Sequence, residues 1–215
     1  MKDFTFKFAN ANFITESLAI GGDLADGLER AADQAAELVD TAGISHVLDV
    51  RWEAEETLWK HFPDVEYRWD GIDDAGQRVP AAWFDRITTW AAQAIADGGV
   101  VLSHCHMGIN RGPSAGFAVL LRLGWDPIDA LDVIRAARPI ANTAYAEDAL
   151  AWHLGRIGAT PAERTRARRR VADWRRTHPL DTLRIIRSVR SQGDGWAART
   201  RPGLIGSGSK RHSLN

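Results

Sequence analysis

The chain alternates short apolar runs with longer stretches in which apolar residues recur at helical spacing. Apolar runs predict strands at 18–20, 44–50 and 65–69, and a further run at 100–102 leads into Ser103-His104-Cys105. Alternating aromatic and polar residues over 4–8 predict an additional edge strand. Helical spacing predicts helices over 28–41, 51–61, 81–97, 114–123, 126–138 and 144–154. Strands that alternate with helices indicate a layered α/β fold.

The last third of the chain has a different pattern. Thr160-Pro161 is typical of a helix start, Pro179 ends that helix, and 180–191 has the spacing of a second helix. From Gln192 onward the chain consists mainly of Gly, Ser and Arg, which predicts disorder. The chain therefore divides into a body over 1–158, a basic helical extension over 159–191 and a disordered tail over 192–215.

Composition indicates a globular protein of a reducing compartment. The 215 residues are 45% hydrophobic, but no apolar stretch approaches a membrane span and the N-terminus lacks the features of a signal peptide. A single cysteine excludes an internal disulfide, which fits the cytoplasm. Arginine greatly outnumbers lysine and alanine is abundant, a composition that favours a high-GC bacterial or phage genome.

The net charge of −1 conceals a strong asymmetry. Residues 1–155 carry 12 basic and 24 acidic residues, whereas residues 156–215 carry 15 and 4. The arginine-rich helices fit three roles: packing on the acidic body, binding RNA or another anionic partner, or lying on a membrane surface. Trp174 and Trp196 among the arginines suit stacking on single-stranded nucleic acid, which supports the second role only slightly.

Residues 99–120 carry the chemistry. A strand, a tight loop and an apolar helix follow one another, so the loop amides and the helix N-terminus direct positive charge at one point. Cys105 lies there and could attack phosphorus as a thiolate. The loop residues His106, Met107, Gly108, Ile109 and Asn110 would hold the phosphate oxygens, and Arg111 would bind two of them as a fork. The alternatives are a buried structural cysteine, or a metal site at His104 and His106. The metal site lacks a second cysteine or a nearby histidine, so no metal or cofactor is predicted.

These residues resemble the His-Cys-x5-Arg signature of the cysteine-based phosphatases, most closely the dual-specificity branch, and the resemblance extends from about residue 12 to about 155. It implies a central, mostly parallel sheet of four to five strands flanked by helices. Two adjacent carboxylates in the loop 71–79, Asp73 and Asp74, are candidates for the general acid. The resemblance favours Asp74. It also implies a supporting role for His104 in the signature, and for Asn142, in the stretch from Arg138 to Asn142, as a brace for the loop.

The resemblance implies a phosphatase that hydrolyses phosphomonoesters of proteins through a phosphocysteine, with phosphotyrosine as a substrate and phosphoserine and phosphothreonine as further candidates. The family usually has a Ser or Thr after the arginine, to help the thiolate leave; here Gly112 stands in that position, and Ser114 is the candidate substitute. The Gly-Ile-Asn-Arg part of the loop is also similar to RNA 5′-phosphatases of the same superfamily. A third possibility is a module that binds phosphate without turnover.

Overall fold

The computed structural model describes residues 4–53, 55 and 57–191, and its centre is a five-stranded sheet in the order β1-β2-β5-β3-β4. Four neighbouring strands run parallel: β2 (Leu18–Gly21), β5 (Val101–His104), β3 (His46–Arg51) and β4 (Glu66–Ile72). The edge strand β1 (Ala11–Phe13) pairs antiparallel with β2. The predicted α/β fold with a mostly parallel sheet is confirmed.

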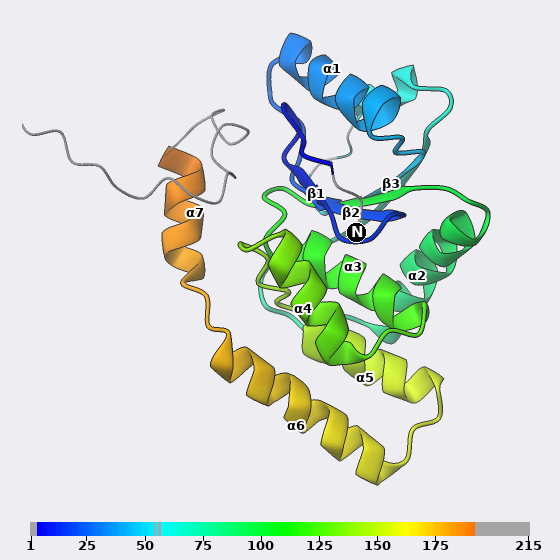
Figure 1. Ribbon diagram of the computed structural model, residues 1–215, viewed down its shortest axis with the longest axis vertical. Coiled ribbons are helices and arrows are strands. Elements are labelled where there is room, and N and C mark those ends of the chain that lie inside the picture. Colours follow the sequence, from blue (N-terminus) through cyan, green and yellow to red (C-terminus); the bar gives the residue numbers. More distant parts are fainter. Residues whose placement is uncertain (1–3, 54, 56, 192–215) are drawn as a thin grey trace, which may run out of the picture.

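Helices cover both faces of this sheet (Figure 1). One face packs against α1 (Leu28–Ala36), its π-helical continuation Glu37–Thr41 and a 3₁₀-helix, Thr57–His61. The other face packs against four helices: α2 (Ala81–Ala96), α3 (Arg111–Arg122), α4 (Pro127–Ala137) and α5 (Ala146–Arg156). Each face therefore has its own hydrophobic cluster, with the sheet between them.

Helix α3 is the central helix of the larger layer. Its residues from Arg111 to Leu121 are buried, because the sheet, α2, α4 and α5 surround it. A helix that is apolar on all sides is typical of such a position. All four residues of β5 are buried as well. The loop that joins β5 to α3 is therefore anchored at both ends in the buried core.

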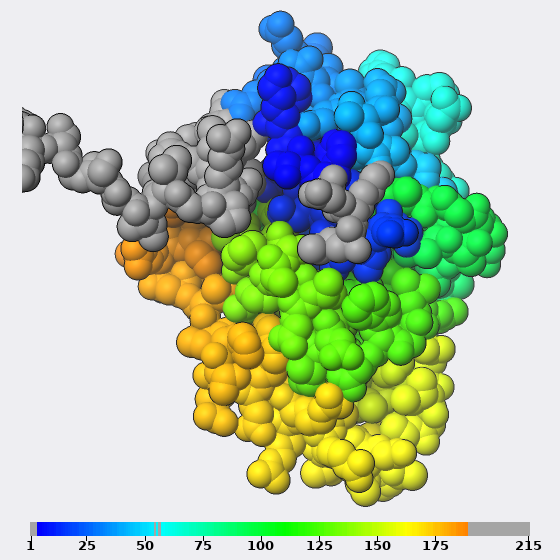
Figure 2. Space-filling model, viewed as in Figure 1, coloured from blue at the N-terminus to red at the C-terminus, as the bar shows by residue number. Residues whose placement is uncertain are grey.

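The C-terminal extension folds as two helices. Thr160 and Glu163 form a reciprocal capping box at the start of α6 (Pro161–Thr177), and Val171 and Trp174 bury their side chains in the cluster shared with α4 and α5. Helix α7 (Thr182–Ser191) extends beyond the body (Figure 1). The space-filling view shows α6 packed along the body (Figure 2). The predicted disordered tail, 192–215, lies outside the described residues.

Three predicted elements differ from those observed. Residues 4–8 form no strand, because the amides of Lys7, Phe8 and Ala9 donate to the carboxylate of Glu37 rather than to a neighbouring strand. Within the predicted helix over 51–61, Arg51 ends β3 and Thr57–His61 form the 3₁₀-helix, while residues 54 and 56 lie outside the described part of the chain. The helix predicted from Ser114 begins earlier, at Arg111.

No helix in the described part of the chain is long and apolar enough to cross a membrane.

Candidate active site

The loop over residues 105–110 lies at the carboxyl end of the parallel strands, where open α/β sheets bind their ligands. Cys105 directly follows β5 and is only 2% exposed. Its amide donates to the carbonyl of Gly21, at the end of the neighbouring strand β2, at 3.3 Å. The thiol is thus fixed at the base of the loop.

The carbonyl groups of the loop point away from the centre of the loop, where they accept hydrogen bonds from surrounding residues. The carbonyl of His106 accepts from the Asp23 amide at 3.0 Å, and that of Ile109 accepts from the Asn142 amide at 2.7 Å. Those of Met107 and Gly108 accept from the guanidinium of Arg138 at 3.0 and 2.7 Å. Because the N–H of each peptide points opposite to its C=O, the amides of the loop face inward.

These inward amides form a cradle for an anion. No acceptor among residues 4–53, 55 and 57–191 takes a hydrogen bond from the backbone N–H of residues 106–111. Buried backbone donors are nearly always satisfied, so a run of open donors at a helix N-terminus indicates a binding site for oxygen atoms of an anion. The predicted phosphate-binding residues are thereby brought together around one point.

Arg138 is the support that sequence reasoning missed. It is 1% exposed, and besides the two loop carbonyls it binds the side-chain oxygens of Asn10 and Asn12, each at 2.8 Å. Burial lowers the pKa of Arg138 to about 10. Within the stretch from Arg138 to Asn142, the resemblance predicted a role only for Asn142.

Asn142 and Ser114 contact the far end of the loop. In addition to its amide bond to Ile109, Asn142 donates from Nδ2 to Oδ1 of Asn110 at 3.0 Å. The Ser114 hydroxyl donates to the Asn110 carbonyl at 2.7 Å and accepts from the Tyr145 amide at 3.0 Å. The proton of Ser114 is therefore already engaged, which does not favour Ser114 as a substitute for a hydroxyl at position 112.

Gly112 lies tightly against the base of the loop. A Cβ there would come 3.2 Å from the backbone nitrogen of Cys105 and from the carbonyl carbon of His104. The carbonyl of Gly112 accepts from the hydroxyl of Ser103 at 3.0 Å. A side chain at position 112 would therefore need the neighbouring backbone to shift slightly.

Arg111 points into the site and is held in place by a residue that the sequence analysis did not select. Nη1 and Nη2 of Arg111 bind both carboxylate oxygens of Glu53, at 2.6 and 2.7 Å, and Nη1 also donates to the carbonyl of Ile72 at 3.1 Å. The hydrogen bonds from Arg111 lower the pKa of Glu53 to about 2. Glu53 follows β3 in a stretch with no distinctive pattern, so only the fold places it beside Arg111.

The two candidate acids occupy different positions. Oδ2 of Asp74 lies 3.8 Å from Nε of Arg111 and accepts from Nδ2 of Asn110 at 3.1 Å. Oδ1 of Asp74 accepts from the hydroxyl of Tyr145 at 3.0 Å. The carboxylate of Asp73 instead accepts from the amide of Asp74 at 2.7 Å, a local turn contact. Asp74 therefore reaches the loop, whereas the Asp73 side chain caps its own turn.

Two histidines flank the cysteine in different environments. His106 is exposed at the rim, where its Nδ1 lies 2.5 Å from Oδ2 of Asp23, and this hydrogen bond raises the pKa of His106. His104 is buried, with Nε2 3.7 Å from Oδ2 of the equally buried Asp49, and burial lowers the pKa of His104. In the described part of the chain, no group of three His, Cys, Asp or Glu side chains is placed to hold a metal ion.

Comparison with known proteins agrees with this geometry. The sequence matches no protein-family model and no curated protein. Among solved structures, Tk-PTP in its active form is 25% identical over 66% of this chain and 94% of its own, with a TM-score of 0.54. Human DUSP28 is 21% identical over 68% and 94%, with a TM-score of 0.56.

A mouse putative dual specificity phosphatase, solved as a complex with zinc tungstate, is 22% identical over 75% of this chain and 97% of its own, with a TM-score of 0.58. Each of these neighbours is matched over at least 94% of its own length. Together with the β5–loop–α3 arrangement, they show that the protein has the fold of the cysteine-based phosphatases of the dual-specificity type.

Proposed function

We propose that the protein is a cysteine-dependent phosphatase that hydrolyses phosphomonoesters on proteins, with phosphotyrosine as the first substrate and phosphoserine and phosphothreonine as further ones. The observation that carries this proposal is the cradle of open backbone donors over residues 106–111, with Cys105 at its base. Such a cradle fits the three non-bridging oxygens of a phosphate. The thiol nucleophile also favours a reducing compartment, the cytoplasm.

Arg111 still has two N–H groups that are available to bind a phosphate. A guanidinium has five N–H groups. Glu53 and the Ile72 carbonyl take three of them from Nη1 and Nη2, which leaves the Nε–H and one Nη2–H. These two point the same way and can bind two phosphate oxygens in parallel. Glu53 thus orients Arg111 without blocking it.

The first half of the reaction transfers the phosphoryl group to the enzyme. The Cys105 thiolate attacks phosphorus, so the S–P bond forms as the ester P–O bond breaks. Asp74, held above the loop by Asn110 and Tyr145, gives its proton to the leaving oxygen. Arg111 and the loop amides stabilise the charge on the equatorial oxygens.

The second half returns the enzyme to its starting state. Asp74, now ionised, takes a proton from water as the water attacks phosphorus, and the S–P bond breaks to release phosphate and the thiolate. At position 112 there is no hydroxyl to assist the departing sulfur. We therefore expect breakdown of the phosphocysteine to limit turnover.

The decisive experiment measures hydrolysis of a phosphotyrosine peptide and an aryl phosphate by the wild type and by Cys105→Ser. We expect the variant to lose at least roughly 10³-fold in kcat, because a serine hydroxyl is not ionised at neutral pH. Rapid acid quenching should trap a phosphorylated protein in the wild type alone. Undiminished hydrolysis by Cys105→Ser would overturn the mechanism, and phosphate binding without hydrolysis would select a binding module instead.

A second candidate is an RNA 5′-phosphatase. The arginines of α6 favour it, since a basic helix beside the site could bind the phosphates that follow the 5′ end. The position of Asp74 favours the protein phosphatase, because an acid above the loop serves a leaving group that must be protonated.

A further inference from the structure

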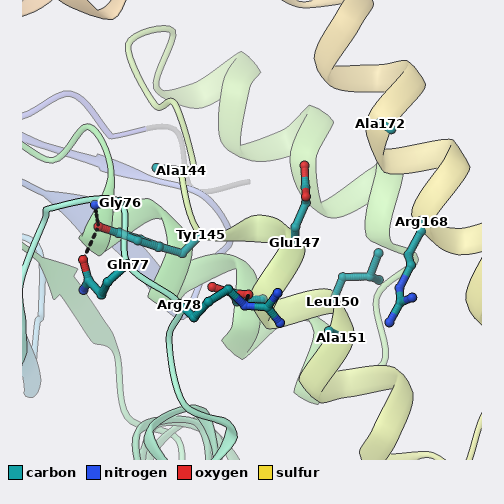
Figure 3. A pocket seen from close by; sticks show the side chains of 11 residues that line it. Gly76, Gln77, Arg78, Ala144, Tyr145, Glu147, Leu150, Ala151, Arg168 and Ala172 are labelled. Carbon is teal, nitrogen blue, oxygen red and sulfur yellow. Dashed lines mark hydrogen bonds and ion pairs between the residues drawn. The ribbon is translucent and has the colours of Figure 1, made fainter.

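A second hollow lies beside the catalytic loop and is not lined by it. A cavity of about 560 Å³ opens between the loop 76–78, the first two turns of α5 and the middle of α6. This volume falls within the roughly 300–1,000 Å³ of small-ligand pockets. One wall therefore comes from the basic extension and the opposite wall from the loop that carries the candidate acid (Figure 3).

Two guanidinium groups face this cavity from opposite walls. Figure 3 shows Arg78 and Arg168 on either side of a floor formed by Leu150 and Ala151. Arg78 uses its Nε to bind Oδ1 of Asp148 at 2.8 Å, and its side chain is 89% exposed, so its terminal nitrogens face solvent. Within the described part of the chain, Arg168 makes no ion pair.

The cavity and the candidate active site share one side chain. Tyr145 lines the cavity, and its hydroxyl donates to Oδ1 of Asp74 at 3.0 Å and accepts from the Gly76 amide at 3.3 Å. A polypeptide whose phosphate occupies the loop can therefore cross the Asp74–Tyr145 edge and continue into the cavity. An extended peptide advances about 3.3–3.6 Å per residue, so a residue a few positions from the phosphorylated one would arrive there.

We propose that this cavity is a specificity subsite for an acidic side chain of the phosphopeptide substrate. The carboxylate would lie between Arg78 and Arg168, and the aliphatic part of the side chain would cover Leu150 and Ala151. This inference rests on the proposed phosphatase function and names a feature of its substrate. Two acidic residues also line the cavity, but Asp148 is paired with Arg78, and Figure 3 shows the Glu147 side chain pointing away from both guanidinium groups.

The test compares phosphotyrosine peptides that differ in one residue, Glu or Ala, at successive positions on each side of the phosphotyrosine. At low ionic strength we expect wild-type kcat/KM to be roughly two- to fivefold higher for Glu than for Ala at one or two neighbouring positions, the size expected for a solvent-exposed ion pair. In Arg168→Ala and Arg78→Ala this ratio should fall to about one. Arg168→Glu should prefer Lys at the same position.

The matched control is Arg169→Ala, which removes the same charge from the neighbouring residue of α6 that does not line the cavity. It should keep the wild-type ratio. The subsite is overturned if Arg168→Glu leaves the ratio of kcat/KM values unchanged. It is also overturned if the wild type prefers Glu to Ala at no position. A loss of rate on 5′-phosphorylated RNA alone in Arg168→Ala overturns its assignment to peptides.

A separate measurement distinguishes failure of the subsite from failure of the proposed function. Fluorescence anisotropy gives the affinity of Cys105→Ser protein for the same labelled peptides, with and without Arg168→Ala. If the wild type hydrolyses no peptide, the proposed function fails, while the Glu-to-Ala affinity ratio still supports or overturns the subsite by the same criterion.

Discussion

At the scale of single residues, the candidate active site depends on side chains that never touch the substrate. Arg138 holds the carbonyl groups of Met107 and Gly108 outward, and so turns the N–H groups of the same two peptides toward the anion. Even with a pKa lowered by burial to about 10, Arg138 stays charged at neutral pH. Its bonds to the loop are therefore charge-assisted, which makes them stronger than bonds between neutral groups.

Gly108 has no room for a side chain. Its φ is +65°, and an added Cβ would lie 2.3 Å from Nη2 of Arg138 and 2.6 Å from the Gly21 carbonyl oxygen. We expect Gly108→Ala to lower the free energy of unfolding by about 2 kcal/mol or more, from backbone strain and displacement of Arg138 together. The Gly108→Ala substitution should also weaken binding of inorganic phosphate. Urea unfolding measures the stability, and isothermal titration calorimetry measures the phosphate affinity.

Gly124→Ala provides the matched control. Gly124 also has a positive φ, +91°, but no atom lies near its missing Cβ. It should lose only about 1 kcal/mol, the cost of the backbone conformation alone, and should bind phosphate normally. If Gly108→Ala behaves like Gly124→Ala in both measurements, contact with Arg138 is not what shapes the loop.

At the scale of elements, α6 supports the segment that braces the loop. Nη1 of Arg175 donates to the carbonyl of Thr143 at 3.1 Å, and the amide of Asn142 next to it donates to the loop. Trp174 is buried, donates from Nε1 to Oδ1 of Asp132 at 2.6 Å and lies under the guanidinium of Arg135. Helix α6 therefore completes the core on this side of the body.

This packing predicts that α6 cannot be removed without loss of stability. Trp174→Ala should lower the free energy of unfolding by about 3 kcal/mol, because it leaves a cavity where the buried indole was. Arg169→Ala, on the exposed side of the same helix, should change it by less than about 0.5 kcal/mol. Urea unfolding followed by circular dichroism measures both. A Trp174→Ala protein as stable as the wild type would instead make α6 a separable appendage.

The elements that the sequence predicted well are those whose signals are local. The apolar run before Cys105 and the apolar helix after it lie within about twenty residues, and the structure places them as β5 and α3. The aromatic alternation over 4–8 was wrong as a strand because its amides are satisfied by Glu37, a side chain some thirty residues away. No local pattern contains that information.

The same distinction separates the predicted site residues from those that were missed. Cys105 and the loop through Arg111 are contiguous, so spacing alone brings them together. Glu53 and Arg138 reach the loop from separate elements, and each is an ordinary charged residue in its own stretch. The sequence could not distinguish Asp73 from Asp74 without the resemblance, because the difference depends on which carboxylate the turn aims at Asn110.

At the scale of the whole molecule, an acidic body is joined to a basic extension that is partly neutralised within the fold. The guanidinium of Arg170 binds both carboxylate oxygens of Asp126, at 2.7 and 2.9 Å, and Arg175 is engaged by the Thr143 carbonyl. This charge serves the packing of α6 on the body. It is therefore less available for a nucleic acid than the count of arginines suggests.

The choice between a protein and an RNA substrate rests on the leaving group. Phosphotyrosine releases a phenoxide whose conjugate acid has a pKa near 10, so its departure at neutral pH needs a proton donor. A 5′-triphosphate releases a phosphate or pyrophosphate that leaves without one. An enzyme built for the first reaction loses much of its rate without its acid, whereas one built for the second loses little.

We expect Asp74→Asn to lower kcat on a phosphotyrosine peptide by roughly 10²-fold, the contribution of a positioned general acid. Asp73→Asn is the control, because its carboxylate binds only the turn, and it should lose much less. The measurement compares both variants with the wild type on the peptide and on 5′-triphosphorylated RNA. If Asp74→Asn retains its rate and RNA has the higher kcat/KM, the molecule acts on RNA, and Asp74 serves to orient Arg111 and Asn110 rather than to transfer a proton.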